Sequence, residues 1–458
     1  MITYIKIDGF KSFNDFEMEF SPFTVIAGSN ASGKSNLFDA LKLLSRMAEV
    51  ELREAFSEQR GNPKELFTQL EDGEYRSKIY FEVDVLVPRS VSDNWGGKLE
   101  LNYTRLKYSV VISREENNLG LEYLSVASES LRRIKPDEDK WLKKFPEAQP
   151  FAKSLRTGGS TVPFIHTTFE GDQPTIKIRQ DGGGGGKVIS ANSVSQTILG
   201  AITSVDFPHV LAVKEEMLSW KYLELNPEEL RLPTKHEPGI KDVVSSDGKN
   251  MAAALYRMKN DDPSILFDVS RRLNSFIPNF TSVDVENDKV NEVFIIKLKD
   301  KDGKVYSSRV LSEGTLRILL LCILHYDEKF SGLICFEEPE NGINPFKIKA
   351  LCELLNDMRV NFLDSEVTAL RQVIVNTHSP TLVGSMMLWS DDKNVSVHYA
   401  ELVTRLISLD NKKMKLGVTK IIPASKANPQ LDLEFSVQER ALTVERIKNY
   451  LELNDTRE

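Results

Sequence analysis

A glycine-rich loop between a strand and a helix constrains the fold of this chain more than any other feature. Residues 28–35 read Gly-Ser-Asn-Ala-Ser-Gly-Lys-Ser, which is the pattern G-x-x-x-x-G-K-S. An apolar strand, 23–27, precedes the loop, and Leu37, Leu41 and Leu44 follow it at helical spacing. Glycines let backbone N–H groups turn toward phosphate oxygens, and the helix N-terminus favours an anion. The sequence therefore predicts a phosphate-binding loop.

Two side chains of this loop have separate tasks. Lys34 would reach the β- and γ-phosphates of a nucleotide, and the Ser35 hydroxyl would hold Mg²⁺. The alternative is a Gly/Ser turn with a chance lysine, which the flanking strand and helix disfavour.

A second apolar strand ends in paired acids. Residues 333–336 lead into Glu337-Glu338-Pro339. Adjacent carboxylates at the end of a buried strand are costly unless a cation or a reacting water uses them. Glu337 could lie near Mg²⁺, and Glu338 could orient or deprotonate the attacking water. Solvated acids at the start of a loop remain the alternative for this pair taken alone.

Two further elements lie at a helix start and a strand end. Residues 311–315, Leu-Ser-Glu-Gly-Thr, precede an apolar helix, so Ser312 is either its N-cap or part of a second phosphate-binding element. His378 follows the apolar strand 372–376 within Thr-His-Ser-Pro and could bond a γ-phosphate or a water. Such ends gather at one edge of an α/β sheet, so the ordered set predicts one nucleotide site in an α/β fold.

This ordered set resembles the ATPase heads of the ABC superfamily in the SMC, Rad50 and RecF branch, and most closely OLD-family (overcoming lysogenization defect) and similar stand-alone bacterial AAA ATPases that lack a TOPRIM domain. The resemblance covers roughly residues 1–85 and 285–390. It implies a P-loop NTPase head of mixed sheet and helices. Between Walker A and the signature motif, the recurring Pro and Gly and the lack of sustained heptads predict a compact α+β lobe inserted into this head. The matching segments are an N-terminal motif at 9–13, Walker A at 28–35, a signature at 311–315, Walker B at 333–340, a D-loop at 341–345 and a switch histidine at 378.

The resemblance implies ATP and Mg²⁺ as cofactors and gives the residues their roles. Glu338 polarises the water, His378 senses the γ-phosphate, and Ser35 and Glu337 hold Mg²⁺. Ser312 and Gly314 act on the ATP of another protomer, in a dimer or a higher even oligomer. The other nucleotide-binding positions are Lys11, Asn30, Ala31, Ser32, Gly33, Lys34, Ser35, Asn36 and, as a Q-loop glutamine, Gln69. For Gln69 an exposed helix or turn residue is the alternative.

The sequence departs from the family pattern at several positions. Ala31 replaces the usual glycine of N-G-S-G-K, so a position that relatives leave without a Cβ must accept one. Glu337 replaces the commoner Asp, and Glu313 and Thr315 differ from L-S-G-G-Q. Asn344 stands where relatives often carry His or Asp. None of these departures removes a catalytic group, so we expect ATP turnover that is slow rather than absent.

The long stretch between Walker A and the signature disfavours a transporter subunit, and it lacks the sustained heptads of an SMC coiled coil. We expect the strands of the inserted lobe to precede its helices. The expected division is 1–85 for the N-terminal part of the head, 86–284 for the inserted lobe, 285–400 for the C-terminal part of the head and 401–458 for a strand and helix tail.

Four local segments receive weaker interpretations. The glycines 182–186 predict a flexible loop rather than a phosphate cradle, because no helix or lysine follows at P-loop spacing. The basic stretch 132–144 could contact nucleic acid, but its acids at 137–139 favour a solvated face. After His378 the chain is short and lacks the acidic pattern of a TOPRIM nuclease. The amphipathic segment 437–451 would dock on the head or bind a partner.

Composition narrows the functional classes. A net charge of −8 argues against coating nucleic acid through overall charge, although a local basic groove for DNA stays possible. Cys322, Cys335 and Cys352 lie in apolar stretches without a metal-ligand pattern, which predicts buried thiols in a reducing compartment. The longest apolar run, Ile318–Leu324, is short against the ~20 residues that cross a bilayer. The start has no signal-peptide pattern, so we expect a cytoplasmic protein without a membrane segment.

These observations favour an ATP-hydrolysing switch whose heads dimerise through ATP and control a partner effector or a nucleic acid. By resemblance, we favour the ATPase component of a bacterial anti-phage defence system that works with a separate effector, such as a nuclease. The alternatives are a RecF-like DNA-repair ATPase and a scaffold that binds ATP with little turnover.

Overall fold

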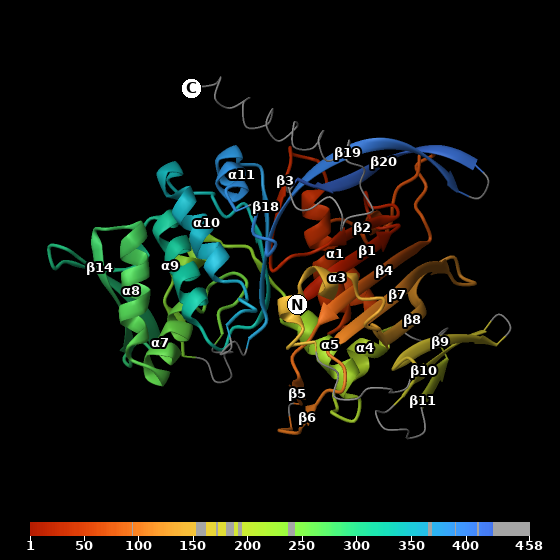
Figure 1. Cartoon of the computed structure of the whole chain (residues 1–458), viewed down its shortest axis with the longest axis horizontal. Coiled ribbons are helices and arrows are strands. Elements are labelled where there is room, and N and C mark those ends of the chain that lie inside the picture. The colour runs from red at the N-terminus through yellow and green to blue at the C-terminus, as the bar shows by residue number, and fades with distance from the viewer. Residues whose placement is uncertain are drawn as a thin grey trace.

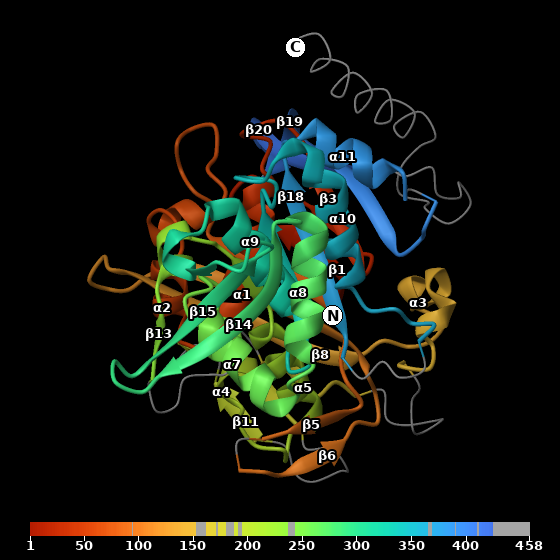
Figure 2. The ribbon, with the colours of Figure 1, turned by 90° about the vertical axis from the view of Figure 1, so that its left-hand side faces the viewer.

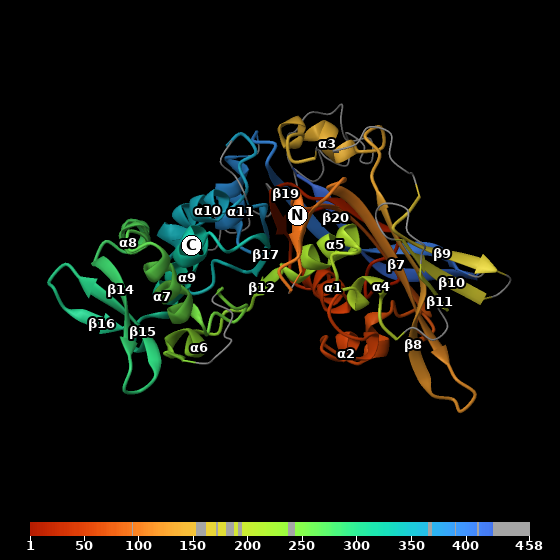
Figure 3. The same ribbon diagram turned by 90° about the horizontal axis from the view of Figure 1, so that it is seen from below.

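Two large sheets enclose a central helix, α1 (Lys34–Met47) (Figure 1). A computed structural model gives this fold. It describes residues 1–93, 95–152, 162–170, 173–179, 187–190, 195–236, 243–364, 369–389, 391–409 and 412–424. Seen from below, strands of the second sheet lie in the middle of the molecule, with α1 and the first sheet on one side and the remaining helices on the other (Figure 3).

The first sheet is antiparallel throughout and has eight strands among the described residues. In β1 and β4 buried and less buried residues alternate, because one face of the sheet packs on α1 and the helices beside it. In spatial order the strands are β11 (Lys187–Ser190), β10 (Gln173–Ile178), β9 (Ile165–Glu170), β8 (Glu122–Arg133), β7 (Arg105–Glu116), β4 (Lys78–Leu86), β1 (Ile2–Asp8) and β2 (Phe16–Glu19).

The second sheet carries the phosphate-loop strand in its middle. In spatial order its described strands are β12 (Lys221–Leu223), β17 (Gly332–Glu337), β18 (Arg371–Thr377), β3 (Phe23–Ala27), β19 (Val395–Leu409) and β20 (Lys412–Pro423). The first five run parallel, and β20 pairs antiparallel with β19. Ile26 packs with α1, whereas Phe23 and Val25 pack on the opposite face. Both faces are covered, which explains why these strands read as continuous apolar runs.

Helices cover both faces of the second sheet. On the side of the first sheet, α2 (Leu52–Ser57), α4 (Ile198–Ala201) and α5 (Pro208–Leu218) lie near α1. The far face carries α6 (Pro227–Arg231), α7 (Met251–Asp261), α8 (Ile265–Phe276), α9 (Glu313–Tyr326), α10 (Ile348–Asp357) and α11 (Pro380–Met387). Helix α9 is buried along most of its length, as its almost uniformly apolar sequence predicts.

A small third sheet lies beside α7 and α8 (Figure 2). Its strands are β13 (Thr234–Lys235), β14 (Phe280–Asp288), β15 (Val293–Asp300) and β16 (Val305–Ser307). The remaining described elements are short: β5 (Ser90–Ser92), β6 (Lys98–Glu100), α3 (Lys140–Lys144) and the 3₁₀ turns η1 (Pro63–Leu66), η2 (Pro146–Ala148), η4 (Ser308–Val310) and η5 (Pro345–Lys347).

The structure confirms the α/β class and the strands expected around the phosphate loop. The segment 86–284 contributes to both halves, because β7 and β8 widen the first sheet while α7 and α8 cover the second. Strand β4 ends close to the boundary expected at residue 85, but it pairs with β1 of the expected head on one side and with β7 of the expected lobe on the other. The fourfold domain division therefore stays a prediction. The glycine run 182–186 and the segment 437–451 lie outside the described residues.

The basic stretch and the cysteines that the sequence analysis singled out have ordinary surroundings in the structure. Arg132 and Lys135 of the basic stretch both pair with Glu138, which fits a solvated face. The three cysteines are free and buried, and burial raises the pKa of each thiol. Within the described part of the chain, no helix combines the length and the apolar character needed to span a membrane.

One buried histidine gives this fold a testable pH dependence. His398 of β19 pairs in register with Ile26 of β3. Among the described residues neither of its ring nitrogens has a hydrogen-bond partner. Burial, with a smaller contribution from the charge of Lys144, lowers the pKa of His398 to about 3.

We predict that His398→Leu flattens the acid side of the stability curve. The unfolded chain takes up a proton on this histidine near its ordinary pKa, and the folded chain resists it, so stability falls as the pH drops below that value. Between pH 7 and pH 4 the wild type should lose about 3 kcal/mol more than the variant. Urea unfolding at a series of pH values measures both curves, and parallel curves would contradict the prediction.

Candidate nucleotide-binding site

The loop after β3 turns sharply into α1 at Gly33. This residue has a φ of +91°, and a Cβ built on it would overlap the Oγ1 of Thr419 in β20. Thr419 also donates to the Ser32 carbonyl at 3.3 Å, and its hydroxyl lies 2.6 Å from that of Ser12. Both the left-handed backbone and the close approach of β20 therefore require glycine here.

Ala31 shows how the loop accepts the substitution that sets it apart from N-G-S-G-K. Its φ is +63°, so a residue with a Cβ occupies the left-handed region. That conformation costs an alanine roughly 1–2 kcal/mol. The loop thus keeps the backbone conformation that a glycine would allow, at a local cost in strain.

The amine of Lys34 is folded back onto its own loop. It donates to the carbonyl oxygens of Gly28 and Ser29, each at 2.7 Å. The residue is only 7% exposed. Burial lowers the pKa of Lys34, although the charges of Glu338 and Glu337 oppose the shift. A cation is therefore held at the centre of the loop with carbonyl partners that an anionic ligand could replace.

Three neighbouring elements bring oxygen ligands together. The Ser35 hydroxyl at the start of α1 donates to Oε1 of Glu337 at the end of β17. The side-chain amide of Asn376, at the end of β18, donates to the same oxygen at 3.1 Å. Asn376 leaves its own Oδ1 buried and without a partner among the described residues. Hydroxyl, carboxylate and amide oxygens are the donors that Mg²⁺ prefers.

Glu338 and His378 form a pair at the mouth of the site. Nδ1 of His378 lies 2.6 Å from one carboxylate oxygen of Glu338, and Asn341 donates to the other at 2.8 Å. Glu338 has a φ of +50°, and its backbone N–H donates to the Asn376 carbonyl at 2.9 Å. A strained backbone that is fixed by neighbouring strands can aim a side chain at a reacting group.

A cavity of about 570 Å³ opens between these elements. It joins the phosphate loop to the carboxylate pair, as the sequence predicts. The lining residues are Ser12, Asn30, Ala31, Ser32, Gly33, Lys34, Ser35, Asn36, Glu337, Glu338, Asn376 and Leu402. His378 reaches the cavity through its contact with Glu338.

Four predicted nucleotide-binding residues lie outside this lining, and Lys11 and Gln69 are the two that belong to the N-terminal part of the chain. Lys11, with a φ of +45°, extends its amine to Asp39 of α1 at 2.6 Å. Arg60 holds the other oxygen of Asp39 at 3.0 Å. Gln69 is exposed, and its amide donates to the Gly73 carbonyl at 3.5 Å. The nucleotide roles of Lys11 and Gln69 therefore stay predictions.

The signature-like segment caps α9 and packs against the D-loop-like segment. The Ser312 hydroxyl accepts from the Thr315 N–H at 3.3 Å. A Cβ on Gly314 would overlap the Gly342 carbonyl oxygen, so the two segments touch only because residue 314 is glycine. Neither Ser312 nor Gly314 lines the cavity of its own chain. Their expected action on another protomer stays a prediction.

Sequence reasoning missed several residues that shape the site. Thr419 and Leu402 come from the β19–β20 hairpin, for which no motif gave a signal. Asn376 could have been found, because it ends a strand as Glu337 does.

The Thr377 hydroxyl donates to Glu340, whose pKa is raised by burial although this bond opposes the shift. Glu340 thereby ties the loop of Glu338 to the loop of His378.

Two family models match separate parts of the chain. Residues 1–118 match the model described as "AAA ATPase domain". Residues 229–384 match the model described as "AAA domain, putative AbiEii toxin, Type IV TA system". The first segment contains the phosphate loop, and the second contains Glu337, Glu338 and His378. The phosphate loop and the carboxylate pair thus lie in segments that are each similar to an AAA family model. No curated protein is significantly similar to the chain.

Solved structures of SMC heads match the chain at low similarity. One is an SMC head bound to the C-winged helix domain of ScpA, with 14% identity, a TM-score of 0.46 and coverage of 93% of this chain and 98% of that one. An SMC head from Thermotoga maritima has 14% identity, a TM-score of 0.36 and coverage of 92% and 98%. An SMC head from Pyrococcus furiosus, bound to the C-terminal domain of ScpA, has 12% identity, a TM-score of 0.41 and coverage of 98% and 99%.

We predict that Gly33→Ala disables the loop whereas Gly73→Ala does not. Both glycines have left-handed backbones, so each variant carries a conformational cost of roughly 1–2 kcal/mol. Only at residue 33 does the new methyl group meet Thr419, since no atom lies within 4 Å of the Cβ position at Gly73. Thermal unfolding and binding of a fluorescent ATP analogue would be measured for both. Nucleotide binding by Gly33→Ala at wild-type strength would refute the packing described for this loop.

Proposed function

We propose that this chain is an ATP-binding and ATP-hydrolysing switch whose heads pair through ATP and which controls a partner effector or a nucleic acid. The observation that carries the proposal is the convergence of Lys34, Ser35, Glu337 and Glu338 on one cavity from distant parts of the sequence. The AAA descriptions of the two matching family models support it.

The residues present fit ATP with Mg²⁺. The cavity has backbone N–H groups and a buried lysine on one side and hard oxygen donors on the other. Ser35 and Glu337 would hold the metal ion, and beside them lies the buried Oδ1 of Asn376, which has no partner within the described part of the chain. When bound, Mg²⁺ neutralises charge on the phosphate oxygens. Lys34 would exchange the carbonyls of its own loop for phosphate oxygens.

Glu338 is the residue that orients and polarises the attacking water. Its carboxylate stands beside the metal-binding Glu337 and is held on both oxygens by His378 and Asn341. His378 would contact the γ-phosphate, and its hydrogen bond to Glu338 would couple the position of the carboxylate to that contact. The loss of this phosphate on hydrolysis would change the His378–Glu338 contact, which gives the site a way to report its nucleotide state.

Pairing through ATP would complete the site. Ser312 and Gly314 lie at the N-terminus of α9, outside the cavity of their own chain, where they are free to approach the nucleotide of a second copy. A symmetric pair would place each signature-like segment against the other protomer's phosphate loop. Formation of the closed pair would then need ATP, and hydrolysis would let the two copies separate.

The wording of one family model supports the proposed biological setting. The model that matches residues 229–384 names the AbiEii toxin and a type IV toxin–antitoxin system. Together with the OLD-like motif order, this supports a role as the ATPase component of a bacterial anti-phage defence system. In that role a separate effector would respond to the open and closed states.

We predict that Glu338→Gln slows ATP hydrolysis by roughly 100-fold or more, because removal of a positioned base costs about that factor. The amide cannot take up a proton, so ATP stays bound and the paired form accumulates. Phosphate release and size-exclusion chromatography with Mg-ATP measure the two effects. Glu353→Gln, on the exposed face of α10, is the matched control and should hydrolyse ATP as wild type does. The Lys34→Ala variant should not bind ATP at all. Wild-type turnover in Glu338→Gln would remove Glu338 from the chemistry.

We predict that Lys34→Ala and Ser312→Arg proteins are each inactive alone and recover part of the activity when mixed. A mixed pair has one site with an intact phosphate loop facing an intact signature-like segment. Recovery should rise with the fraction of mixed pairs, and circular dichroism checks that each variant is folded. A mixture as inactive as its components would argue that Ser312 does not act across the pair.

A further inference from the structure

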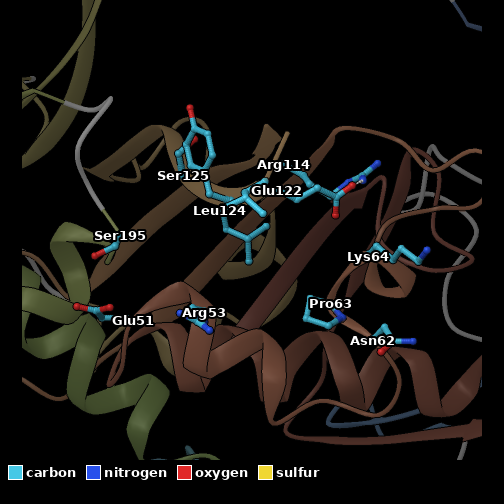
Figure 4. A pocket seen from close by; sticks show the side chains of 12 residues that line it. Glu51, Arg53, Asn62, Pro63, Lys64, Arg114, Glu122, Leu124, Ser125 and Ser195 are labelled. Atoms are coloured by element: carbon cyan, nitrogen blue, oxygen red, sulfur yellow. Dashed lines mark hydrogen bonds and ion pairs between the residues drawn. The ribbon is translucent and has the colours of Figure 1, made fainter. Parts of the chain in front are cut away.

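Two cavities in the described part of the chain differ in what they can hold. One, of about 940 Å³, lies between the helical segment α2–η1 and the ends of β7 and β8 (Figure 4). Its lining mixes Arg53 and Lys64 with Glu51 and Glu122, so its charge favours no class of ligand. The nucleotide cavity is more informative, because its mainly polar lining contains one large apolar side chain, Leu402.

Leu402 stands beside the phosphate loop because β19 is longer than its neighbour β3. The parallel pairing of these two strands ends at Ala27 and Tyr399. Strand β19 continues beyond that point, where it pairs with β20. The Ala400 carbonyl comes so close to the start of the loop that a Cβ built on Gly28 would overlap it. Leu402 follows in the same strand and is level with the loop.

The pairing of β19 with β20 turns Leu402 toward the cavity. Leu402 lies directly opposite Thr419 in this antiparallel pair, and residues that are opposite each other share one face of a sheet. The Thr419 hydroxyl contacts Ser12 and the Ser32 carbonyl, so this face is directed at the phosphate loop. Leu402 lines the cavity and is 54% exposed, so its side chain is accessible to a ligand.

The order of the strands places Leu402 at the end of the cavity opposite the carboxylate pair. Glu337 and Glu338 follow β17, and Leu402 belongs to β19, with β18 and β3 between them. Neighbouring strands lie about 4.8 Å apart, so β17 and β19 are separated by roughly 14 Å. The groups proposed to act on the γ-phosphate and the metal ion therefore lie at one end. The sugar and the base of the nucleotide would extend toward the other.

Leu402 has the chemistry that the face of a nucleobase requires. This face is flat and weakly polar, and covering it with an apolar side chain removes it from water. Proteins often use an aromatic ring for this purpose, but none of the described residues that line the cavity is aromatic. Ala31 is the other apolar residue of the lining, and its small side chain belongs to the phosphate loop itself.

We propose that Leu402 forms the nucleobase subsite of this chain and packs against the face of the base. The presence of a nucleotide rests on the proposed function. The β19–β20 hairpin then has two tasks, because Thr419 supports the phosphate loop and Leu402 covers the base. The contact with Leu402 raises the affinity for a nucleotide above that for its phosphates and sugar alone.

The test compares ADP with ribose 5′-diphosphate, which keeps the sugar and the phosphates but lacks the base. Binding of each ligand to the full chain, with Mg²⁺ present, is measured by isothermal titration calorimetry. Leu402→Ser should bind ADP about tenfold more weakly than wild type and should bind ribose 5′-diphosphate as wild type does. Leu402→Met keeps an apolar side chain of similar size and should bind ADP as wild type does.

Two further variants of the hairpin are controls. Leu406→Ser makes the same change on the same face of β19, at a residue that is 72% exposed and lies outside the cavity lining. It should bind both ligands as wild type does. Thr419→Val should weaken the binding of both ligands, because Thr419 bonds to the phosphate loop itself.

Two results for Leu402→Ser would overturn the subsite. One is an equal loss of affinity for both ligands, which would make Leu402 a support of the loop. The other is unchanged ADP binding; if Mg-ATP then also fails to pair a protein carrying Leu402→Ser and Glu338→Gln, Leu402 is a contact between copies. A wild type that binds neither ligand would refute the proposed nucleotide function itself, so the two failures are distinguishable.

Discussion

The parallel ladder of β17, β18, β3 and β19 is the constraint on which the site depends. Strands that run the same way end at the same edge of a sheet, so whatever follows each strand is delivered to one place. Here the ladder delivers the phosphate loop, the pair Glu337–Glu338 and the segment Asn376–His378. Core side chains cover both faces of the ladder, which stabilises the ends against independent movement.

The β19–β20 hairpin is a second support for the phosphate loop. Thr419 bonds with Ser12 and with the Ser32 carbonyl, and it fills the space that a side chain at residue 33 would need. The loop is thus held by β20 and by the turn between β1 and β2 that contains Ser12. A change in this hairpin would alter phosphate binding without touching any residue of the motif.

Backbone strain gathers around the site. Three residues with a Cβ and a positive φ lie there: Lys11 beside α1, Ala31 in the phosphate loop and Glu338 at the carboxylate pair. Such conformations persist only where the surrounding structure fixes them, and they commonly mark positions that bind or switch.

The sequence by itself determined the phosphate loop, the carboxylate pair and the α/β class, because each depends on local patterns of residue type and spacing. It also indicated that these pieces belong to one site, since strand ends of an α/β sheet share an edge. Only the tertiary structure decided that Asn376 joins Glu337, that Thr419 and Leu402 border the cavity, and that Gln69 lies outside its lining. These facts depend on the order of the strands in the sheet and on which segments pack together. Such packing joins residues that are hundreds of positions apart, so no short sequence motif reveals it.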